Sequence, residues 1–243
     1  MSYILVATGL RREAKLIARP GVVAVACGGH GAVLEAALEA RIAAERPLAV
    51  MSIGIAGALD PELGVGDVVQ NTVRRSRAGG NPGTSTSEVL GSRFRGNDDR
   101  ESNTDRSGQE IIGVDLAVTT VAAKAALRAA TGAAAVDMES HVVARVAAHH
   151  DLPFAALRVI SDTAHHDLPP AACVPLRPDG GVDLPAVLTA LARQPGQLTA
   201  LLRLARDTSR ALAVLAGLLR RFDGLPRDRL LGLDLSELGL DVL

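Results

Sequence analysis

The chain has 243 residues, with 26 Lys plus Arg against 27 Asp plus Glu and a formal net charge of −1. This balance argues against a chain that binds nucleic acid through an overall positive field. Aromatic residues make up only 2%, which excludes the stacking platforms used for single-stranded nucleic acid. Two cysteines, Cys27 and Cys173, are too few for a disulfide framework or a zinc ribbon, so we expect a cytoplasmic protein.

The first half of the chain alternates short apolar runs with segments of helical composition. We predict strands at 3–7, 22–26 and 48–53 and a helix at 32–45. Such alternation indicates a mainly parallel sheet with helices on both faces, in which functional groups gather at the carboxyl ends of the strands. Those ends carry Gly9, Gly28 with Gly29, and a glycine-rich turn at 54–57.

The pattern breaks over residues 71–110, which are rich in Gly, Ser, Asn, Asp and Arg and have almost no apolar periodicity. We interpret this stretch as a long flexible loop. It is either a lid over an active site or an inserted or replaced surface segment, and we favour the second interpretation because structureless stretches of this length are uncommon in compact domains.

Order resumes at residue 111. We predict strands at 111–118 and 154–160 and helices at 121–130, 140–150, 184–192 and 197–219. The fold class is therefore α/β with three layers, a mainly parallel or mixed central sheet flanked by helices. We expect a single domain over residues 1–220 and a weakly structured tail over 221–243.

Four local signals mark candidate chemistry. They are Glu13 after the first strand, the turn at 54–57 after the third, Met138-Glu139-Ser140 at a helix start and Ser161-Asp162 at the end of an apolar strand. Each also has a purely structural interpretation, as a close-packing glycine, a helix-dipole partner or a helix cap. His165 and His166 suggest a metal, but no third ligand with suitable spacing stands near them, so we expect no metal and no cofactor.

Together these segments resemble the purine nucleoside phosphorylase and nucleosidase superfamily, which includes enzymes that hydrolyse methylthioadenosine and S-adenosylhomocysteine. The matching motifs are ATGLRREAKLI (7–17), SIGIAGALDPELGVGDVV (52–69), AAAVDMESHVVARVA (133–147) and PFAALRVISDTA (153–164). Residues 165–212 look like the hopanoid-associated branch, whose members are assigned to releasing adenine from adenosylhopane. The resemblance implies a nucleoside phosphorylase-like fold and an enzyme that cleaves the N-glycosidic bond of a 5′-modified adenosine, here adenosylhopane.

The resemblance assigns the purine end of the site. It makes Asp162 the general acid that protonates N7 of the leaving base, with Ser161 holding it in place. The strand that ends at Val118 matches the segment whose backbone binds the purine edge, and Ala117 stands near the position of the family's aromatic residue. Ala56 and Gly57 complete this part of the substrate site.

The resemblance also assigns the sugar end. Glu139 matches the carboxylate that accepts hydrogen bonds from the ribose hydroxyls and favours positive charge on the sugar. Met138 matches the residue packed beneath the ribose, and Asp137 is expected to be peripheral.

Two nucleophiles are compatible with the resemblance. Glu13 aligns with the carboxylate that activates water in hydrolytic nucleosidases. Gly9, Arg11 and Arg12 stand where phosphorolytic relatives bind phosphate, a group that suits the bidentate arginine fork. We favour phosphorolysis, with inorganic phosphate as co-substrate, because the hopanoid branch is described as phosphorylases. The alternatives are a hydrolytic nucleosidase and a degenerate protein that binds nucleosides without turnover.

The implied 5′ tail is a rigid hydrocarbon and requires an apolar pocket open toward a membrane. The helix at 197–219 mixes apolar residues with Arg203, Arg206 and Arg210. It is either a core helix with a solvated arginine face, which we favour, or a basic amphipathic helix that touches the inner membrane surface. No signal peptide or membrane-spanning helix is expected, and the resemblance implies a homo-oligomer.

Overall fold

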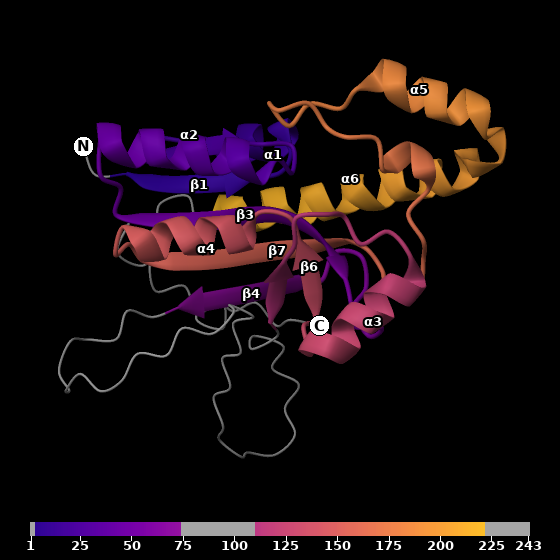
Figure 1. The fold of residues 1–243 in the computed structure, drawn as a ribbon, viewed down its shortest axis with the longest axis horizontal. Coiled ribbons are helices and arrows are strands. Elements are labelled where there is room, and N and C mark those ends of the chain that lie inside the picture. The colour runs from indigo at the N-terminus through magenta and orange to yellow at the C-terminus, as the bar shows by residue number, and fades with distance from the viewer. Residues whose placement is uncertain (1–2, 74–109, 222–243) are drawn as a thin grey trace, which may run out of the picture.

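A computed structural model describes residues 3–73 and 110–221 as a three-layer α/β fold (Figure 1). Strands of the described residues form one sheet in the order β2-β1-β3-β6-β5, with β7 on the other edge of β3 and β4 beyond β7. The strands are β1 (Ile4–Thr8), β2 (Val22–Ala26), β3 (Ala49–Ala58), β4 (Val68–Val73), β5 (Ile111–Gly113), β6 (Ala135–Asp137) and β7 (Phe154–Asp162). Four of the six pairings are parallel, and only β3·β6 and β4·β7 are antiparallel. The predicted fold class is confirmed.

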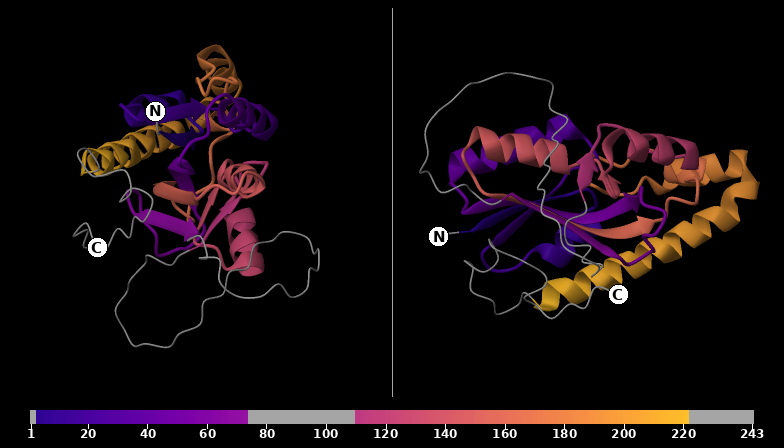
Figure 2. Two further views of the ribbon diagram at one scale, coloured as in Figure 1. Left: turned by 90° about the vertical axis from the view of Figure 1, so that its left-hand side faces the viewer. Right: turned by 90° about the horizontal axis from the view of Figure 1, so that it is seen from below.

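Helices cover both faces of this sheet (Figure 2). One face carries α1 (Arg11–Ile17) and α6 (Leu198–Arg221), and the other carries α2 (Gly31–Ala44) and α4 (Ser140–His149). In β1, Ile4 and Val6 pack with α6 while Leu5 and Ala7 pack with α2 and α4, because side chains alternate along a strand. Burial on both faces explains why the strands were recognisable as continuous apolar runs.

The remaining helices lie at the edges of this core. The helix α3 (Val121–Thr131) begins at Thr120, whose side chain accepts a hydrogen bond from the Ala123 amide, and ends at the left-handed Gly132 as predicted. Two short 3-10 turns, Pro170–Ala172 and Pro195–Gln197, flank α5 (Leu184–Arg193), which has no buried residue.

The helix α6 joins the core only through its second half. Its buried residues are Ala211, Leu212, Leu215, Leu218 and Leu219, while Arg206 and Arg210 are exposed. This arrangement is that of a core helix with a solvated arginine face. In the described part of the chain, no helix has the length and apolar character needed to cross a membrane.

The strand β3 changes neighbours along one of its edges. Residues 49–52 pair with β1, and residues 57–58 pair with β6, while the other edge pairs with β7 from Val50 to Gly57. Between β1 and β6, residues 53–56 have no partner among the described strands on the first edge. The sheet is therefore open at the carboxyl end of β1, and the candidate site is built around this opening.

The structure differs from the sequence-based expectation in four places along the sheet, and one of them is β6, which was not predicted. Residues 54–57, predicted as a turn, continue β3 because β7 supplies pairing partners along this stretch. The strand predicted at 111–118 ends at Gly113, since its neighbour β6 has only three residues. The unpredicted β4 includes residues 71–73, the start of the predicted loop. The rest of that loop, 74–109, and the predicted tail from residue 222 lie outside the described residues.

Candidate active site

Glu13 lies in the opening between β1 and β6. It belongs to the first turn of α1, and its side chain is buried. Its Oε2 accepts a hydrogen bond from the Leu10 amide at 2.7 Å, and its Oε1 accepts one from the Ile55 amide at 2.8 Å. A Cβ added at Gly54 would lie 2.7 Å from Oε1, so only glycine lets the carboxylate approach β3 this closely. The carboxylate thus accepts the hydrogen bond from the Ile55 amide that a neighbouring strand would otherwise accept.

Two further carboxyl groups and one guanidinium gather beside Glu13. Arg158, buried on β7, donates from Nε to Asp137 Oδ2 at 2.7 Å and from Nη2 to Ser52 Oγ at 2.6 Å. Its Nη2 lies 3.6 Å from Glu139 Oε2. Asp137 also accepts hydrogen bonds from the Glu139 and Ser140 amides at the start of α4. The expectation that Asp137 is peripheral is wrong, because a buried arginine requires a carboxylate partner.

The charge of this cluster is unbalanced. Burial raises the pKa of Glu139 to about 8, and burial also raises the pKa of Glu13, against hydrogen bonds from Leu10 and Ile55 that lower it. Burial alone would lower the pKa of Arg158, but Asp137 and Glu139 hold that pKa above its usual value. Arg158 therefore stays charged, and Glu139 can hold or release a proton near neutral pH.

Asp162 lies at the end of β7, and its side chain is 14% exposed. Its Oδ2 accepts a hydrogen bond from Lys124 Nζ at 2.7 Å. Its Oδ1 accepts a longer one, at 3.2 Å, from Ser161 Oγ, which also lies 3.2 Å from the Ala56 carbonyl oxygen. A Cβ added at Gly57 would lie 3.0 Å from Oδ2, so the glycine leaves room for the carboxylate. The predicted group of Asp162, Ser161, Ala56 and Gly57 is thus brought together.

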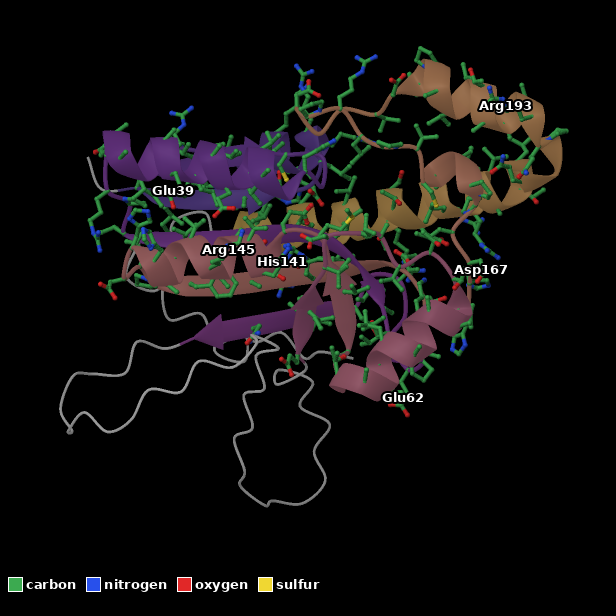
Figure 3. The ribbon with its side chains drawn as sticks, in the orientation of Figure 1. Glu39, Glu62, His141, Arg145, Asp167 and Arg193 are labelled. Carbon is green, nitrogen blue, oxygen red and sulfur yellow. The ribbon has the colours of Figure 1, made fainter. Side chains whose placement is uncertain are left out.

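The segment expected to bind the purine edge lies between β5 and α3. Val118 is half-buried against a small apolar cluster, and Ala117 is exposed. His141 of α4, labelled in Figure 3, places Nε2 3.0 Å from Asp115 Oδ1 in this segment. Met138 is half-buried, with its terminal methyl group beside Gly29. None of these side chains forms a recorded hydrogen bond or ion pair with Glu13, Asp137 or Glu139.

The three residues predicted to bind phosphate have separate surroundings. A Cβ added at Gly9 would lie 2.8 Å from Glu139 Oε1, so Gly9 borders the carboxylate cluster. The exposed guanidinium of Arg11 pairs with Asp179 at 3.1 Å, and the Arg11 amide donates to the Gly180 carbonyl at 3.0 Å. Arg12 is exposed. Phosphate binding by these residues stays a prediction.

Sequence analysis missed Arg158 and Lys124. Arg158 left a signal, because it is the one charged residue inside the apolar run at 154–160 and a buried charge requires partners. Lys124 left none, because an alanine-rich helix carries lysine equally well on a solvated face. His165 and His166 bond to different partners, Pro61 and Thr163. The described residues contain no group of three or more His, Cys, Asp or Glu placed to hold a metal ion.

Comparisons with known proteins give a family and a fold. The sequence model described as "Phosphorylase superfamily" matches residues 14–90 and 110–174. No curated protein matches the chain. The S-adenosylhomocysteine nucleosidase of Streptococcus pyogenes, solved with 5-methylthiotubericidin, has 16% identity and a TM-score of 0.51, covering 93% of this chain and 98% of its own. The futalosine hydrolase of Helicobacter pylori has 20% identity and a TM-score of 0.46, covering 68% and 86%.

Proposed function

The chain belongs to the phosphorylase superfamily, and we propose that it hydrolyses the N-glycosidic bond of a purine nucleoside, with Glu13 activating the water. The enzyme class predicted from the sequence, a nucleoside phosphorylase or nucleosidase, is confirmed by this membership. The observation that carries the choice of hydrolysis is the buried Glu13 carboxylate, held by two backbone amides beside Glu139. Burial raises the pKa of Glu13, and a higher pKa makes a carboxylate a stronger base toward water.

In this reaction Asp162 acts on the purine, while Glu139 and Glu13 act on the sugar and the water. The bond from C1′ to N9 breaks with its electron pair moving to the purine, while Asp162 donates a proton to N7. The sugar becomes a cation like an oxocarbenium ion, which Glu139 stabilises when its carboxyl group is ionised. Water attacks C1′ and gives its proton to Glu13, so that the products are a free base and a free sugar. Glu13 and Asp162 are held for these steps by hydrogen bonds from their neighbours, and Glu139 lies 3.6 Å from the Arg158 guanidinium.

Phosphorolysis has less support at the same place. The Leu10 and Arg11 amides, which would face an anion at the start of α1, already donate to Glu13 and to Gly180. The Glu139 carboxyl group also borders Gly9, and its ionised form would repel phosphate. Phosphorolysis by Gly9, Arg11 and Arg12 is therefore the alternative that the test must distinguish.

For the substrate we propose a 5′-modified adenosine, including adenosylhopane. The fold neighbour from Streptococcus pyogenes was solved with 5-methylthiotubericidin, a nucleoside analogue. The hydrocarbon tail rests on the resemblance of residues 165–212 and on the exposed leucines of α5 and α6, since Leu184, Leu188 and Leu202 are each more than 60% exposed. Such surface suits an apolar tail or a membrane. Equal sedimentation of wild type and an L184S/L188S/L202S variant with anionic liposomes at low salt would contradict the membrane contact.

The test is adenine release from 5′-methylthioadenosine and adenosylhopane, with and without phosphate. We expect release that does not depend on phosphate and that falls about 10²–10⁴-fold in Glu13→Gln and in Asp162→Asn. Arg145→Ala removes an exposed ion pair of α4 and is the control for effects of substitution and purification that are unrelated to the site. Release that requires phosphate would establish a phosphorylase, and binding without release would establish the degenerate nucleoside-binding protein.

A further inference from the structure

Lys124 is a lysine on α3 whose side chain is fully buried. It is paired with Asp162, the proposed general acid, across a distance of 2.7 Å. We propose that Lys124 is the positioning residue of this acid, which holds one oxygen of Asp162 and stabilises the carboxylate that remains after proton transfer. The inference rests on the proposed function and extends it to a residue outside the four sequence motifs.

All three N–H donors of the Lys124 ammonium are used within the protein. They donate to Asp162 Oδ2 at 2.7 Å, to the Thr163 carbonyl at 2.8 Å and to the His166 carbonyl at 3.1 Å. An ammonium group has three donors and no acceptor. Lys124 therefore has no donor left for a substrate and acts through Asp162.

The helix that carries Lys124 is attached to the loop that follows Asp162. Asp167, labelled beside α3 in Figure 3, accepts a hydrogen bond from the Val121 amide at 2.6 Å. The Leu168 amide donates to the Thr119 carbonyl at 2.8 Å. These two hydrogen bonds attach the start of α3 to residues 163–168. They therefore help to fix the position of the Lys124 ammonium relative to Asp162.

The other charged groups near the pair are engaged elsewhere. Arg128 of α3 pairs with Asp60 at 2.8 Å, Asp167 accepts from the Val121 amide, and the His166 ring bonds to Thr163 Oγ1 at 2.9 Å. Within the described residues, the ammonium of Lys124 is the cation that contacts the Asp162 carboxylate. Substitution of Lys124 therefore removes the cation that contacts Asp162 and tests the effect of this cation on the acid.

The geometry assigns different tasks to the two oxygens of Asp162. Oδ2 is taken by Lys124, and Oδ1, with one hydrogen bond of 3.2 Å from Ser161, is the oxygen left for the purine. In the reaction the proton moves from Oδ1 to N7 as the C1′–N9 pair moves to the base, and no proton leaves Lys124. The carboxylate produced is then stabilised by the adjacent ammonium, a charge-assisted hydrogen bond away from bulk water.

The experiment measures kcat, KM and their pH dependence for Lys124→Gln, Lys124→Met and Lys124→Arg. We expect kcat to fall about tenfold or more in the two neutral variants, with KM changed less. Removal of the ammonium should change the shape of the kcat/KM pH profile, because the charge beside the reacting carboxyl group is lost, whereas a purely structural role would leave the profile of the remaining activity unchanged. Lys124→Arg keeps the charge and should keep the wild-type profile. In an Asp162→Asn background, Lys124→Gln should cause little additional loss.

Several outcomes would overturn the inference. One is a Lys124→Gln variant that loses thermal stability while its pH profile stays that of the wild type, since Lys124 would then be structural only. Another is a double variant in which the losses of kcat caused by Lys124→Gln and Asp162→Asn are fully additive. The amide of Lys124→Gln can still donate a hydrogen bond to the backbone carbonyl oxygens. This variant therefore replaces Lys124→Met in the test if Lys124→Met does not fold. If the wild type itself releases no base, the proposed function fails. The pH dependence of nucleoside binding then tests Lys124, and an unchanged dependence in Lys124→Gln overturns the inference.

Discussion

The two ends of the candidate site use carboxylates in opposite ways. At one end Glu13, Asp137 and Glu139 share a single buried cation, Arg158. At the other end Asp162 has its own cation, Lys124. Arg158 and Asp162 lie on the same strand, about 13 Å apart by strand geometry. Under the proposed function the two ends would have different tasks, because an excess of ionised carboxyl groups favours a cationic sugar and a matched pair favours defined proton transfer.

Removing the shared cation should have the largest effect on stability. Arg158→Met leaves Asp137 and Glu139 buried without their partner, and we expect the free energy of unfolding to fall by about 3–5 kcal/mol. Arg145→Met is the matched control, because Arg145 pairs with Glu35 on the surface at 2.8 Å and should contribute less than about 1 kcal/mol. Urea unfolding of both variants checks this, and equal losses would contradict the contrast between buried and exposed pairs.

A change of pH should have a smaller effect and should act on the carboxylate cluster. Burial raises the pKa of Glu139 in the folded protein to about 8, whereas the ordinary pKa of a glutamate is 4.5. Between these values the folded state binds more protons, so stability falls as the pH rises. We expect the Tm of the unliganded protein to decrease by several degrees across this range and Glu139→Gln to flatten the decrease. A Tm that rises with pH would show that the carboxyl groups are ionised in the folded protein.

The smallest effect is expected at the edge of the site. Arg11 and Asp179 form an exposed ion pair whose side chains are 61% and 54% exposed. Arg11→Ala should therefore change the free energy of unfolding by less than about 1 kcal/mol, and turnover should remain independent of phosphate. If Arg11→Ala lowered the activity measured with phosphate and left the activity measured without phosphate unchanged, Arg11 would be assigned to phosphate binding. That result would favour phosphorolysis.

Local patterns in the sequence predicted most elements of the fold and the three carboxylates Glu13, Glu139 and Asp162. Apolar runs and segments of helical composition are short-range signals, so they placed most of the predicted strands and helices to within a few residues. They failed at residues 54–57, which contain two glycines and continue as strand because β7, about a hundred residues later in the chain, pairs with them.

The sequence by itself determined the alternation of strands and helices and the strand ends where functional groups collect, and it singled out Asp162, Glu139 and Glu13 as candidate site residues. Only the tertiary structure decided which cations meet them. Arg158 reaches Asp137 and Lys124 reaches Asp162 across 21 and 38 residues of chain. The physical reason is that a buried charge is satisfied by whatever the packing of distant elements brings near it, and no local pattern records that choice.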